Sequence, residues 1–284
     1  MEMTFWPAPA KLNLFLHIVG RRADGYHLLQ TVFQFLDYGD ALRFESLSGG
    51  RLRRDGGAAG VPEADDLCIR AANRLQEVAN IREGALIELH KHLPMGGGLG
   101  GGSSDAATTL VALNHLWKAG LSVEELAELG LELGADVPVF IRGHAAWGEG
   151  VGERLQPLDE LPEPWYVVIA PPVHVATAQL FANEKLTRDC HPIKIRDFLH
   201  GEGGNVFEPV VREQYPEIAR ALDFLNGYAP ARLTGTGACV FAPFPNEGAA
   251  REALQHLPDR WRGFVARGVN ISPLWRRLQQ ERPA

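Results

Sequence analysis

The sequence predicts an α+β protein built of two domains. Its 284 residues are enough to bury two hydrophobic cores, and a composition of 45% hydrophobic and 22% charged residues is typical of globular proteins. Segments with strand periodicity and with helix periodicity alternate along the chain. Residues 157–164, rich in prolines and acids, are the best candidate for a domain boundary. We therefore expect an N-terminal domain over residues 1–157 and a C-terminal α+β domain over residues 158–284.

The composition disfavours several classes of function. The net charge is −7 and no run of lysine or arginine stands out, which argues against nucleic-acid binding. The longest apolar runs, such as residues 166–173, are far too short to cross a bilayer, and Pro7 and Pro9 argue against a signal peptide. The three cysteines are widely spaced, as in proteins of a reducing compartment. We expect a cytoplasmic protein with no nucleic-acid or membrane partner, and the oligomeric state stays open.

A strand is predicted over residues 11–18. Its leucines, at positions 12, 14 and 16, share one face, whereas Lys11 and Asn13 point to the other. A lysine at this place is either solvated or held for chemistry among apolar neighbours, and the residues alone leave both interpretations open.

Asp24 and Gly25 form a turn signal between this strand and a second one over residues 28–36. The simplest interpretation is a plain hairpin. Tyr26 and His27, beside the turn, place an aromatic ring next to a hydrogen-bonding ring, which is a pair suited to a nucleobase.

The segment of residues 45–64 reads as a loop because it is rich in glycine, serine and arginine. Asp65 or Asp66 then caps a helix. The predicted apolar face of this helix consists of Leu67, Ala71, Leu75 and Val78.

Residues 94–105, the first glycine loop, contain six glycines between a predicted strand over residues 85–93 and a predicted helix. Apolar residues recur at helical spacing after the loop, and Ser103 or Ser104 is placed to cap that helix. Glycines allow backbone N–H groups to turn toward a ligand, and the helix N-terminus adds roughly half a positive charge. The loop therefore predicts an anion site, most often one for phosphate.

Other glycine-rich motifs fit this loop less well. Gly96, Gly98 and Gly101 satisfy G-x-G-x-x-G, but a dinucleotide fold requires a strand running directly into the first glycine and an acid about 20 residues later. A Walker-A loop needs a lysine before the serine, and protein kinases need H-R-D and D-F-G motifs. A flexible linker rarely runs straight into a capped amphipathic helix.

The next helix begins with a capping box of Ser122 and Glu125 and ends at Gly134. Its predicted buried face consists of Leu126, Leu129 and Leu133. Asp136 then occupies a helix N-cap position with Pro138 in the first turn, and a simple cap is the favoured interpretation from the residues alone. A tight hairpin is expected over residues 143–152.

The C-terminal part contains a predicted buried strand over residues 165–170 and a helix that Thr177 caps and that carries Leu180 and Phe181. Pro216 begins another helix. Further on we expect a second glycine loop followed by an apolar strand over residues 233–241, a helix over residues 246–257 and a last strand over residues 263–271. Gly235 and Gly237, in the second glycine loop, predict a tight turn unless this loop faces the first one.

Three separated segments, residues 9–14, 94–107 and 233–238, resemble the three motifs of the GHMP kinases, and the likeness runs nearly end to end. The motifs are specific in combination. The resemblance implies a two-domain GHMP kinase fold, in which a ribosomal-protein-S5-domain-2-like N-terminal domain and a ferredoxin-like C-terminal domain enclose the active site in the cleft between them. It also implies ATP bound at the first glycine loop, with Mg²⁺, and transfer of its γ-phosphate to an alcohol.

Residues 22–27 and 133–138 further resemble family members whose small-molecule substrate is a cytidine-diphosphate-linked sugar alcohol. The resemblance places the catalytic pair on Lys11 and Asp136, and it implies that the cytosine base lies between two rings. The implied substrate-binding residues are Asn13, Tyr26, His27 and Phe181. The implied ATP-binding residues are Lys91, Pro94, Met95, Gly96, Gly97, Gly98, Leu99, Gly100, Gly101, Gly102, Ser103 and Ser104. Mg²⁺ is expected through the ATP and Ser104.

Two points stay open. Asp66 stands where an asparagine is expected near the nucleotide, so its role is undecided. The alternatives to the cytidine-linked acceptor are a GHMP kinase with another small alcohol, such as homoserine or mevalonate, and a nucleotide-binding regulator without catalysis.

Overall fold

The computed structural model describes residues 5–57 and 60–281. Its strands form one mixed sheet with the order β3-β4-β2-β10-β7-β9-β8, while β1 and β5 also pair with β2, and β6 pairs with β5. The strands are β1 (Trp6–Arg21), β2 (His27–Leu47), β3 (Leu52–Gly56), β4 (Gly84–His90), β5 (Ala146–Gly150), β6 (Arg154–Pro157), β7 (Trp165–Ala170), β8 (Arg232–Leu233), β9 (Val240–Phe244) and β10 (Arg262–Val269). The helices are α1 (Leu67–Ala79), α2 (Gly101–Leu116), α3 (Val123–Leu133), α4 (Val137–Arg142), α5 (Thr177–Ala182), α6 (Ile195–Leu199), α7 (Glu208–Gln214), α8 (Pro216–Asn226), α9 (Glu247–Gln255) and α10 (Pro273–Glu281).

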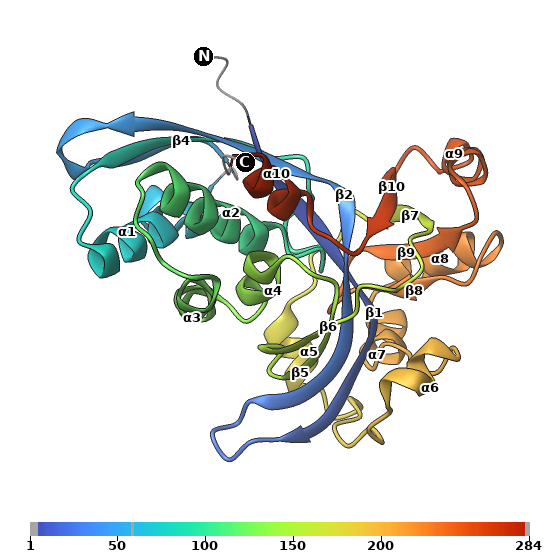
Figure 1. The fold of residues 1–284 in the computed structure, drawn as a ribbon. Helices are drawn as coiled ribbons and strands as arrows, with labels where there is room; N and C mark the ends of the chain where they lie inside the picture. The colour runs from blue at the N-terminus through green and yellow to red at the C-terminus, as the bar shows by residue number, and fades with distance from the viewer. Residues whose placement is uncertain (1–4, 58–59, 282–284) are drawn as a thin grey trace.

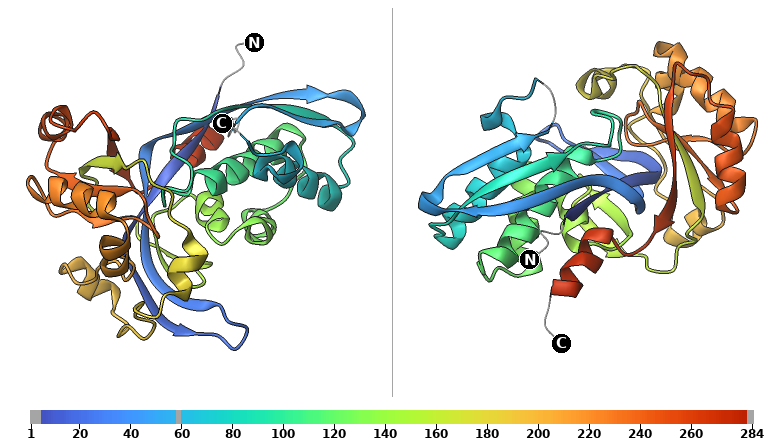
Figure 2. Two further views of the ribbon diagram at one scale, coloured as in Figure 1. Left: turned by 180° about the vertical axis from the view of Figure 1, so that it is seen from behind. Right: turned by 90° about the horizontal axis from the view of Figure 1, so that it is seen from above.

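The long antiparallel hairpin of β1 and β2 runs through the middle of the molecule (Figure 1). The predicted turn at Asp24 and Gly25 closes it. β4 and β5 pair with β2, and β10 pairs with the same strand through Leu36 and Phe35. The hairpin therefore joins the two halves of the chain, which lie on either side of it in Figure 2.

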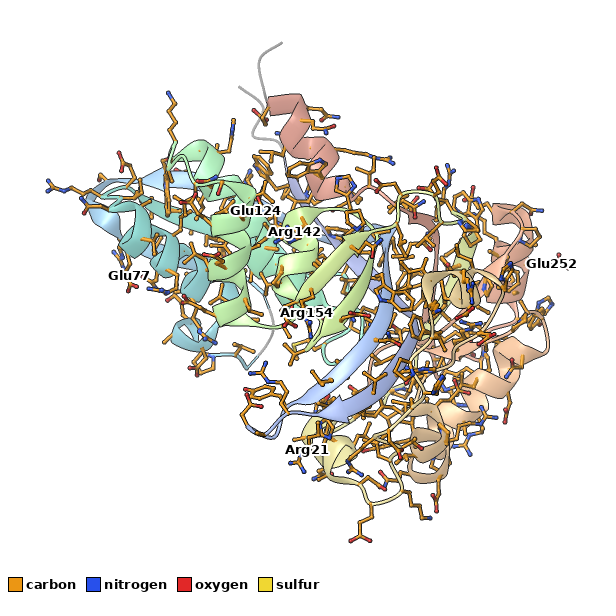
Figure 3. All side chains as sticks on the ribbon, turned by 60° about the horizontal axis from the view of Figure 1, so that its bottom comes forward. Arg21, Glu77, Glu124, Arg142, Arg154 and Glu252 are labelled. Carbon is orange, nitrogen blue, oxygen red and sulfur yellow. The ribbon has the colours of Figure 1, made fainter. Side chains whose placement is uncertain are left out.

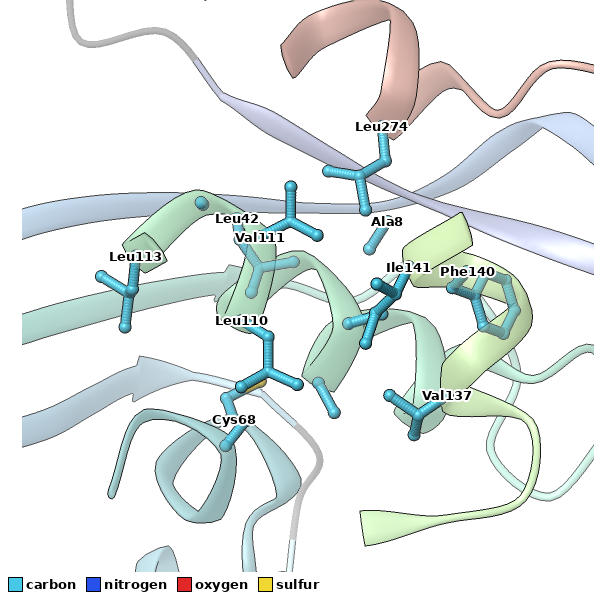
Figure 4. Close-up of a cluster of buried hydrophobic side chains, with 14 of the residues drawn as sticks. Ala8, Leu42, Cys68, Leu110, Val111, Leu113, Val137, Phe140, Ile141 and Leu274 are labelled. Atoms are coloured by element: carbon cyan, nitrogen blue, oxygen red, sulfur yellow. The ribbon is translucent and has the colours of Figure 1, made fainter. Parts of the chain in front are cut away.

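The core of the N-terminal half forms around α2, which packs against β1 and is surrounded by α1, α3 and α4. Figure 4 shows Leu110 and Val111 of α2 in one buried cluster with Leu42 of β2, Ile141 of α4 and Leu274 of α10. Each fully buried aliphatic side chain stabilises the fold by roughly 1.5–3 kcal/mol. The last helix thus returns to the first half of the chain and completes its core. The domain boundary after residue 157 stays a prediction.

The core of the C-terminal half lies between the β7–β9–β10 part of the sheet and the helices α8 and α9. β7 coincides with the predicted strand over residues 165–170 and pairs with β10 on one side and β9 on the other. Val167 and Ile169 are fully buried, and they pack in a cluster that includes Leu222 of α8 and Ala250 of α9. A central strand covered on its faces explains the continuous apolar run in the sequence.

Several predicted helix boundaries are confirmed. Asp66 caps α1, and its Oδ1 accepts a hydrogen bond from the backbone N–H of Cys68 at 2.8 Å. Ser122 and Glu125 form the capping box of α3, and Pro216 begins α8. These signals lie within a few residues of the structure that they specify, so neighbouring residues suffice to predict them.

Two predicted caps are wrong. Neither Ser103 nor Ser104 caps α2, because Gly100 occupies the N-cap position in the left-handed conformation. Thr177 is the first residue of α5 rather than its cap, which is Ala176.

Other local predictions need correction. The loop predicted over residues 45–64 contains the end of β2 and all of β3. Val78 is exposed instead of lying on the buried face of α1. The turn of the hairpin predicted over residues 143–152 lies after β5, beyond Gly150, and β6 follows it. The sequence did not predict α6, α7 or α10, of which α6 has only five residues.

Ion pairs on the surface link neighbouring elements. Arg142 Nη1 of α4 lies 2.8 Å from Glu124 Oε1 of α3, and Figure 3 shows the two side chains close together. Such exposed pairs contribute at most about 1 kcal/mol each. Within residues 5–57 and 60–281, none of the helices combines the length and the apolar character needed to cross a bilayer.

Candidate active site

A cleft of about 1180 Å³ opens where the two halves of the chain meet. Its walls come from β1, the tip of the β1–β2 hairpin, α5 and both glycine loops. Lys11, Asp136, the four predicted substrate-binding residues and every predicted ATP-binding residue except Ser104 line it. The structure thus places residues that are far apart in the sequence around one cavity. Their roles stay predictions.

The backbone of the first glycine loop lies in close contact with neighbouring residues. Gly98 and Gly100 have φ values of +77° and +72°, a conformation that residues with a Cβ rarely adopt. A Cβ on Gly98 would lie 2.2 Å from the carbonyl oxygen of Thr234, and one on Gly100 would lie 2.8 Å from Phe140 Cζ. The first turn of α2 borders the cleft directly after this loop. Its unpaired N–H groups and the helix dipole favour an anion there.

Lys11 and Asp136 form an ion pair in the wall of the cleft. Lys11 Nζ lies 3.2 Å from Asp136 Oδ2, and the side chains are 3% and 34% exposed, respectively. The ammonium group is therefore buried behind a carboxylate that reaches the cleft. Asp136 does precede α4 as predicted, but its side chain makes no capping hydrogen bond. The carboxylate is thus turned toward Lys11 instead of toward the helix, which corrects the simple-cap interpretation.

Asn13 connects this ion pair to β2. Its Oδ1 accepts a hydrogen bond from Lys11 Nζ at 2.6 Å, and its Nδ2 donates to Thr31 Oγ1 at 2.9 Å. Lys11 Nζ also lies 5.4 Å from the centroid of the Phe33 ring. Buried polar side chains with all these partners are held in one orientation. Thr31 carried no signal in the sequence, where it was only one residue of a predicted strand.

The aromatic residues gather at the other end of the cleft. The rings of His27 and Phe181 stack at a centroid distance of 4.9 Å and an interplanar angle of 25°, whereas Tyr26 is 66% exposed. Two rings at this distance leave no space for a third ring between them. Burial lowers the pKa of His27, and the nearby Arg21 and Arg188 cations lower it further. A nucleobase entering this region would therefore meet a neutral imidazole and a free tyrosine ring.

Lys91 is held between two buried carboxylates. Its Nζ donates to Asp40 Oδ2 and, at 2.7 Å, to Asp105 Oδ2. Burial raises the pKa of Asp105 to about 7; Lys91 opposes this rise and Asp40 adds to it. Asp105 ends the glycine-loop motif, but no local pattern predicts that it pairs with Lys91 and lines the cleft.

Ser104 lies apart from the other residues of its motif. It is fully buried and absent from the cleft wall, and its hydroxyl has no hydrogen-bond partner within the described part of the chain. Ser103 does line the cleft. Over residues 5–57 and 60–281, no group of three or more His, Cys, Asp or Glu residues is arranged to hold a metal ion. The Mg²⁺ contact of Ser104 therefore stays a prediction without geometric support.

Asp66 lines the cleft with both carboxylate oxygens engaged. Oδ1 caps α1, while Oδ2 accepts a hydrogen bond from Arg54 Nη1 at 2.6 Å. A charged guanidinium is best paired with a carboxylate, which explains why aspartate stands here where asparagine was expected.

The second glycine loop, residues 233–239, faces the first one. The Cys239 N–H donates to Gly97 O at 3.1 Å, and Thr234 Oγ1 donates to Gly98 O at 3.2 Å. Gly235 and Gly237 line the cleft. The second loop is therefore more than a tight turn, because it supports the first loop and forms part of the cavity.

Comparisons with known proteins agree with this geometry. The family model described as "GHMP kinases N terminal domain" matches residues 66–144, and the model described as "GHMP kinases C terminal" matches residues 188–263. A crystal structure of 4-(cytidine 5'-diphospho)-2C-methyl-D-erythritol kinase is 33% identical with a TM-score of 0.81, covering 94% of this chain and 99% of its own. The mevalonate kinase of Methanococcus jannaschii, at 19% identity and a TM-score of 0.69 over 95% of this chain and 99% of its own, shares the fold.

Two curated relatives are much closer in sequence, and both carry the name 4-diphosphocytidyl-2-C-methyl-D-erythritol kinase. The one from Nitrosococcus oceani is 60% identical over 96% of this chain and 97% of its own length. The one from Alkalilimnicola ehrlichii is 58% identical over 97% of this chain and 94% of its own. With both family models matched and such identity over almost the whole length, the chain belongs to the 4-diphosphocytidyl-2-C-methyl-D-erythritol kinases of the GHMP kinase family.

Proposed function

We propose that this protein transfers the γ-phosphate of ATP to the 2-hydroxyl of 4-diphosphocytidyl-2-C-methyl-D-erythritol, in the non-mevalonate route to isoprenoid precursors. The observation that carries the proposal is the contact of 3.2 Å between Lys11 Nζ and Asp136 Oδ2 in a cleft that the first glycine loop also lines. A cation, a carboxylate and a phosphate-binding loop are the groups that phosphoryl transfer to an alcohol requires.

The nucleotide triphosphate binds along the first glycine loop and the first turn of α2. The loop amides donate hydrogen bonds to phosphate oxygens, and the positive end of the helix attracts their charge. The neighbours of Gly98 and Gly100, Thr234 and Phe140, leave no space for a Cβ at either position, so that only glycine lets the loop backbone pack this closely. Mg²⁺ bound with the ATP would supply further charge neutralisation, and Ser103, whose residue lines the cleft, is the hydroxyl of this motif that would face it, whereas Ser104 is buried outside the cleft wall.

Asp136 acts as the general base. Its Oδ accepts the proton of the acceptor hydroxyl while that oxygen forms a bond to the γ-phosphorus, and the bond from phosphorus to the β–γ bridging oxygen breaks, so that ADP leaves. Lys11 stabilises the negative charge that develops on the attacking oxygen, and Asn13 holds the ammonium group in place through its bond of 2.6 Å. A positioned base contributes about 10²–10⁴-fold to the rate.

The cytosine base is recognised at the hairpin tip. Tyr26 offers a free ring face, and Phe181 offers a second one once it separates from His27. His27 Nε2 is buried without a hydrogen-bond partner in the described residues, which suits a bond to the polar edge of a base. Homoserine and mevalonate have no ring to stack here, so these residues favour the cytidine-linked acceptor over other GHMP substrates.

The decisive experiment is the Asp136→Asn variant assayed for ADP release with ATP and 4-diphosphocytidyl-2-C-methyl-D-erythritol. We expect kcat to fall by about 10²–10⁴-fold while ATP binding, measured by titration calorimetry, is retained. Asp259→Asn, an exposed aspartate outside the cleft, is the matched control. A kcat within a few-fold of the wild-type value would exclude Asp136 as the base.

The acceptor is tested separately with Tyr26→Ala. Loss of the stacking surface removes about 1–3 kcal/mol of base binding, so the KM for the acceptor should rise by about 5- to 150-fold. The KM for ATP serves as the internal control. An unchanged acceptor KM would favour a substrate without a base, and ATP binding without phosphorylation of any acceptor would favour a non-catalytic regulator.

A further inference from the structure

Thr234, at the start of the second glycine loop, is fully buried and uses every polar group it has. Its backbone N–H donates to Cys239 O at 3.1 Å, and its carbonyl accepts from the Gly237 N–H at 3.0 Å. These two bonds close the loop on itself. The side-chain hydroxyl is therefore left for contacts outside the loop.

The Thr234 hydroxyl bridges two other segments of the cleft wall. Oγ1 accepts a hydrogen bond from the backbone N–H of Asn13 at 3.1 Å and donates one to the carbonyl of Gly98 at 3.2 Å. A hydroxyl has one proton to donate and lone pairs to accept, so both bonds form at once. One oxygen atom thus connects β1 with the first glycine loop, across separations of 221 and 136 residues in the chain.

One partner of this hydroxyl lies with the residues proposed to activate the acceptor alcohol, and the other lies in the loop proposed to bind the nucleotide. Asn13 binds Lys11 Nζ, on the side where the alcohol is activated. Gly98 belongs to the loop proposed to bind the phosphates, and the carbonyl of Thr234 already blocks any side chain at that glycine. The distance between the activated alcohol and the phosphate to be transferred therefore depends on how these two segments are held.

Asn205 holds the second glycine loop from behind. Its Nδ2 donates to Leu233 O at 2.9 Å and to Gly235 O at 2.8 Å, the carbonyls on either side of Thr234. The side chain is buried, and its Oδ1 accepts from the Phe207 N–H at 2.9 Å. These bonds hold the backbone on both sides of Thr234, and they therefore restrict movement of its hydroxyl relative to Asn13 and Gly98.

The same two segments are also joined directly, because the Lys11 N–H donates to Leu99 O at 3.0 Å. We infer that Thr234 is a positioning residue whose hydroxyl, together with this direct bond, holds the alcohol-activating residues and the nucleotide loop at a fixed separation. It touches neither substrate and acts through Asn13 and Gly98. The inference rests on the proposed function for its kinetic consequence, but the hydrogen-bonded bridge is a property of the protein without ligands.

The test is Thr234→Val, which keeps the β-branched shape and removes only the hydroxyl, compared with Thr234→Ser, which keeps the hydroxyl. We expect Thr234→Val to lower kcat at least tenfold, equivalent to about 1.4 kcal/mol, with a change of less than threefold in either KM. Thr234→Ser should stay within threefold of the wild type. Titration of each variant with ATP should give about one binding site per chain, which shows that a lower kcat does not come from unfolded protein.

Thr108→Val is the matched control, because Thr108 is equally buried and its hydroxyl donates to a backbone carbonyl, Pro7 O, at 3.1 Å. It should lower thermal stability as Thr234→Val does but leave kcat unchanged. Wild-type kcat in Thr234→Val, or equal losses in the serine and valine variants, would overturn the inference. If the valine variant does not fold, Thr234→Ala takes its place with the same expectations.

Hydrogen exchange gives a readout that needs no activity. The Asn13 N–H should exchange faster in Thr234→Val than in the wild type or in Thr108→Val, since its acceptor is gone. Unchanged exchange of this amide would contradict the bridge itself. Absence of kinase activity in the wild-type protein would instead contradict the proposed function and leave this measurement valid.

Discussion

Replacing Gly98 by alanine tests whether the first glycine loop needs its close backbone contact. At φ +77° an alanine costs roughly 1–2 kcal/mol in backbone strain. In addition, the new Cβ would lie 2.2 Å from Thr234 O, so the loop has to move by about 1 Å to reach van der Waals contact. Such overpacking typically costs a further 1–3 kcal/mol or so. The expected total is about 2–5 kcal/mol.

Gly49→Ala separates the two contributions. Gly49 has nearly the same φ, +76°, but a Cβ there meets no atom within 4 Å. It should therefore show the backbone strain alone, which lowers Tm by roughly 2–6 °C for a chain of this size. Gly98→Ala should lower Tm at least twice as much in calorimetry.

The affinity for ATP is the second property to measure in Gly98→Ala. If the loop relieves the clash by moving away from Thr234, the amides proposed to bind phosphate move with it, and ATP affinity should fall by about tenfold or more. Gly49→Ala should bind ATP like the wild type. Equal Tm values for the two variants together with unchanged ATP affinity would refute the claim that the two glycine loops are in obligatory contact.

Two further predictions concern residues around the cleft. Because the pKa of Asp105 is raised from 3.8 to about 7, the folded state binds its proton more tightly than the unfolded chain, so this contribution to stability is complete below about pH 4 and is lost as the pH rises through 7. Tm measured from pH 4.5 to 8 should therefore fall in the wild type relative to Asp105→Asn, and parallel curves would contradict this. Arg188 donates from its guanidinium to three backbone carbonyls in the last turn of α5 and the segment after it, including that of Phe181 at 2.8 Å. Arg188→Met should make the Phe181 ring more mobile, and it should therefore raise the acceptor KM several-fold with little change in kcat. A lower kcat with an unchanged acceptor KM would show that this contact serves another role.

Much of the local structure could be predicted from the sequence. The apolar run of β7, the cap of α1 at Asp66 and the capping box at Ser122 are encoded by residues next to one another. The first glycine loop could be identified for the same reason, because a strand, six glycines and a helix follow directly in the chain. The motifs also identified the family, which the comparisons confirm.

Where neighbouring signals competed, the sequence was misleading. Ser103 and Ser104 are good caps by residue type, yet the close packing of the loop places Gly100 at the cap in a conformation that favours glycine. Asp136 is also a good cap by type, but its carboxylate turns to Lys11, a residue 125 positions away. Tertiary contacts overrode the local preference in both places.

The sequence by itself predicted most of the elements, the place of the first glycine loop between a strand and a helix, and the residues proposed for phosphate binding and catalysis. Only the tertiary structure decided which of them meet: the ion pair of Lys11 and Asp136, the bridge through Thr234, and the pairing of Lys91 with Asp40 and Asp105. Helical and strand periods are set by short-range geometry, whereas these contacts join residues brought together by the packing of whole elements, which no local pattern encodes.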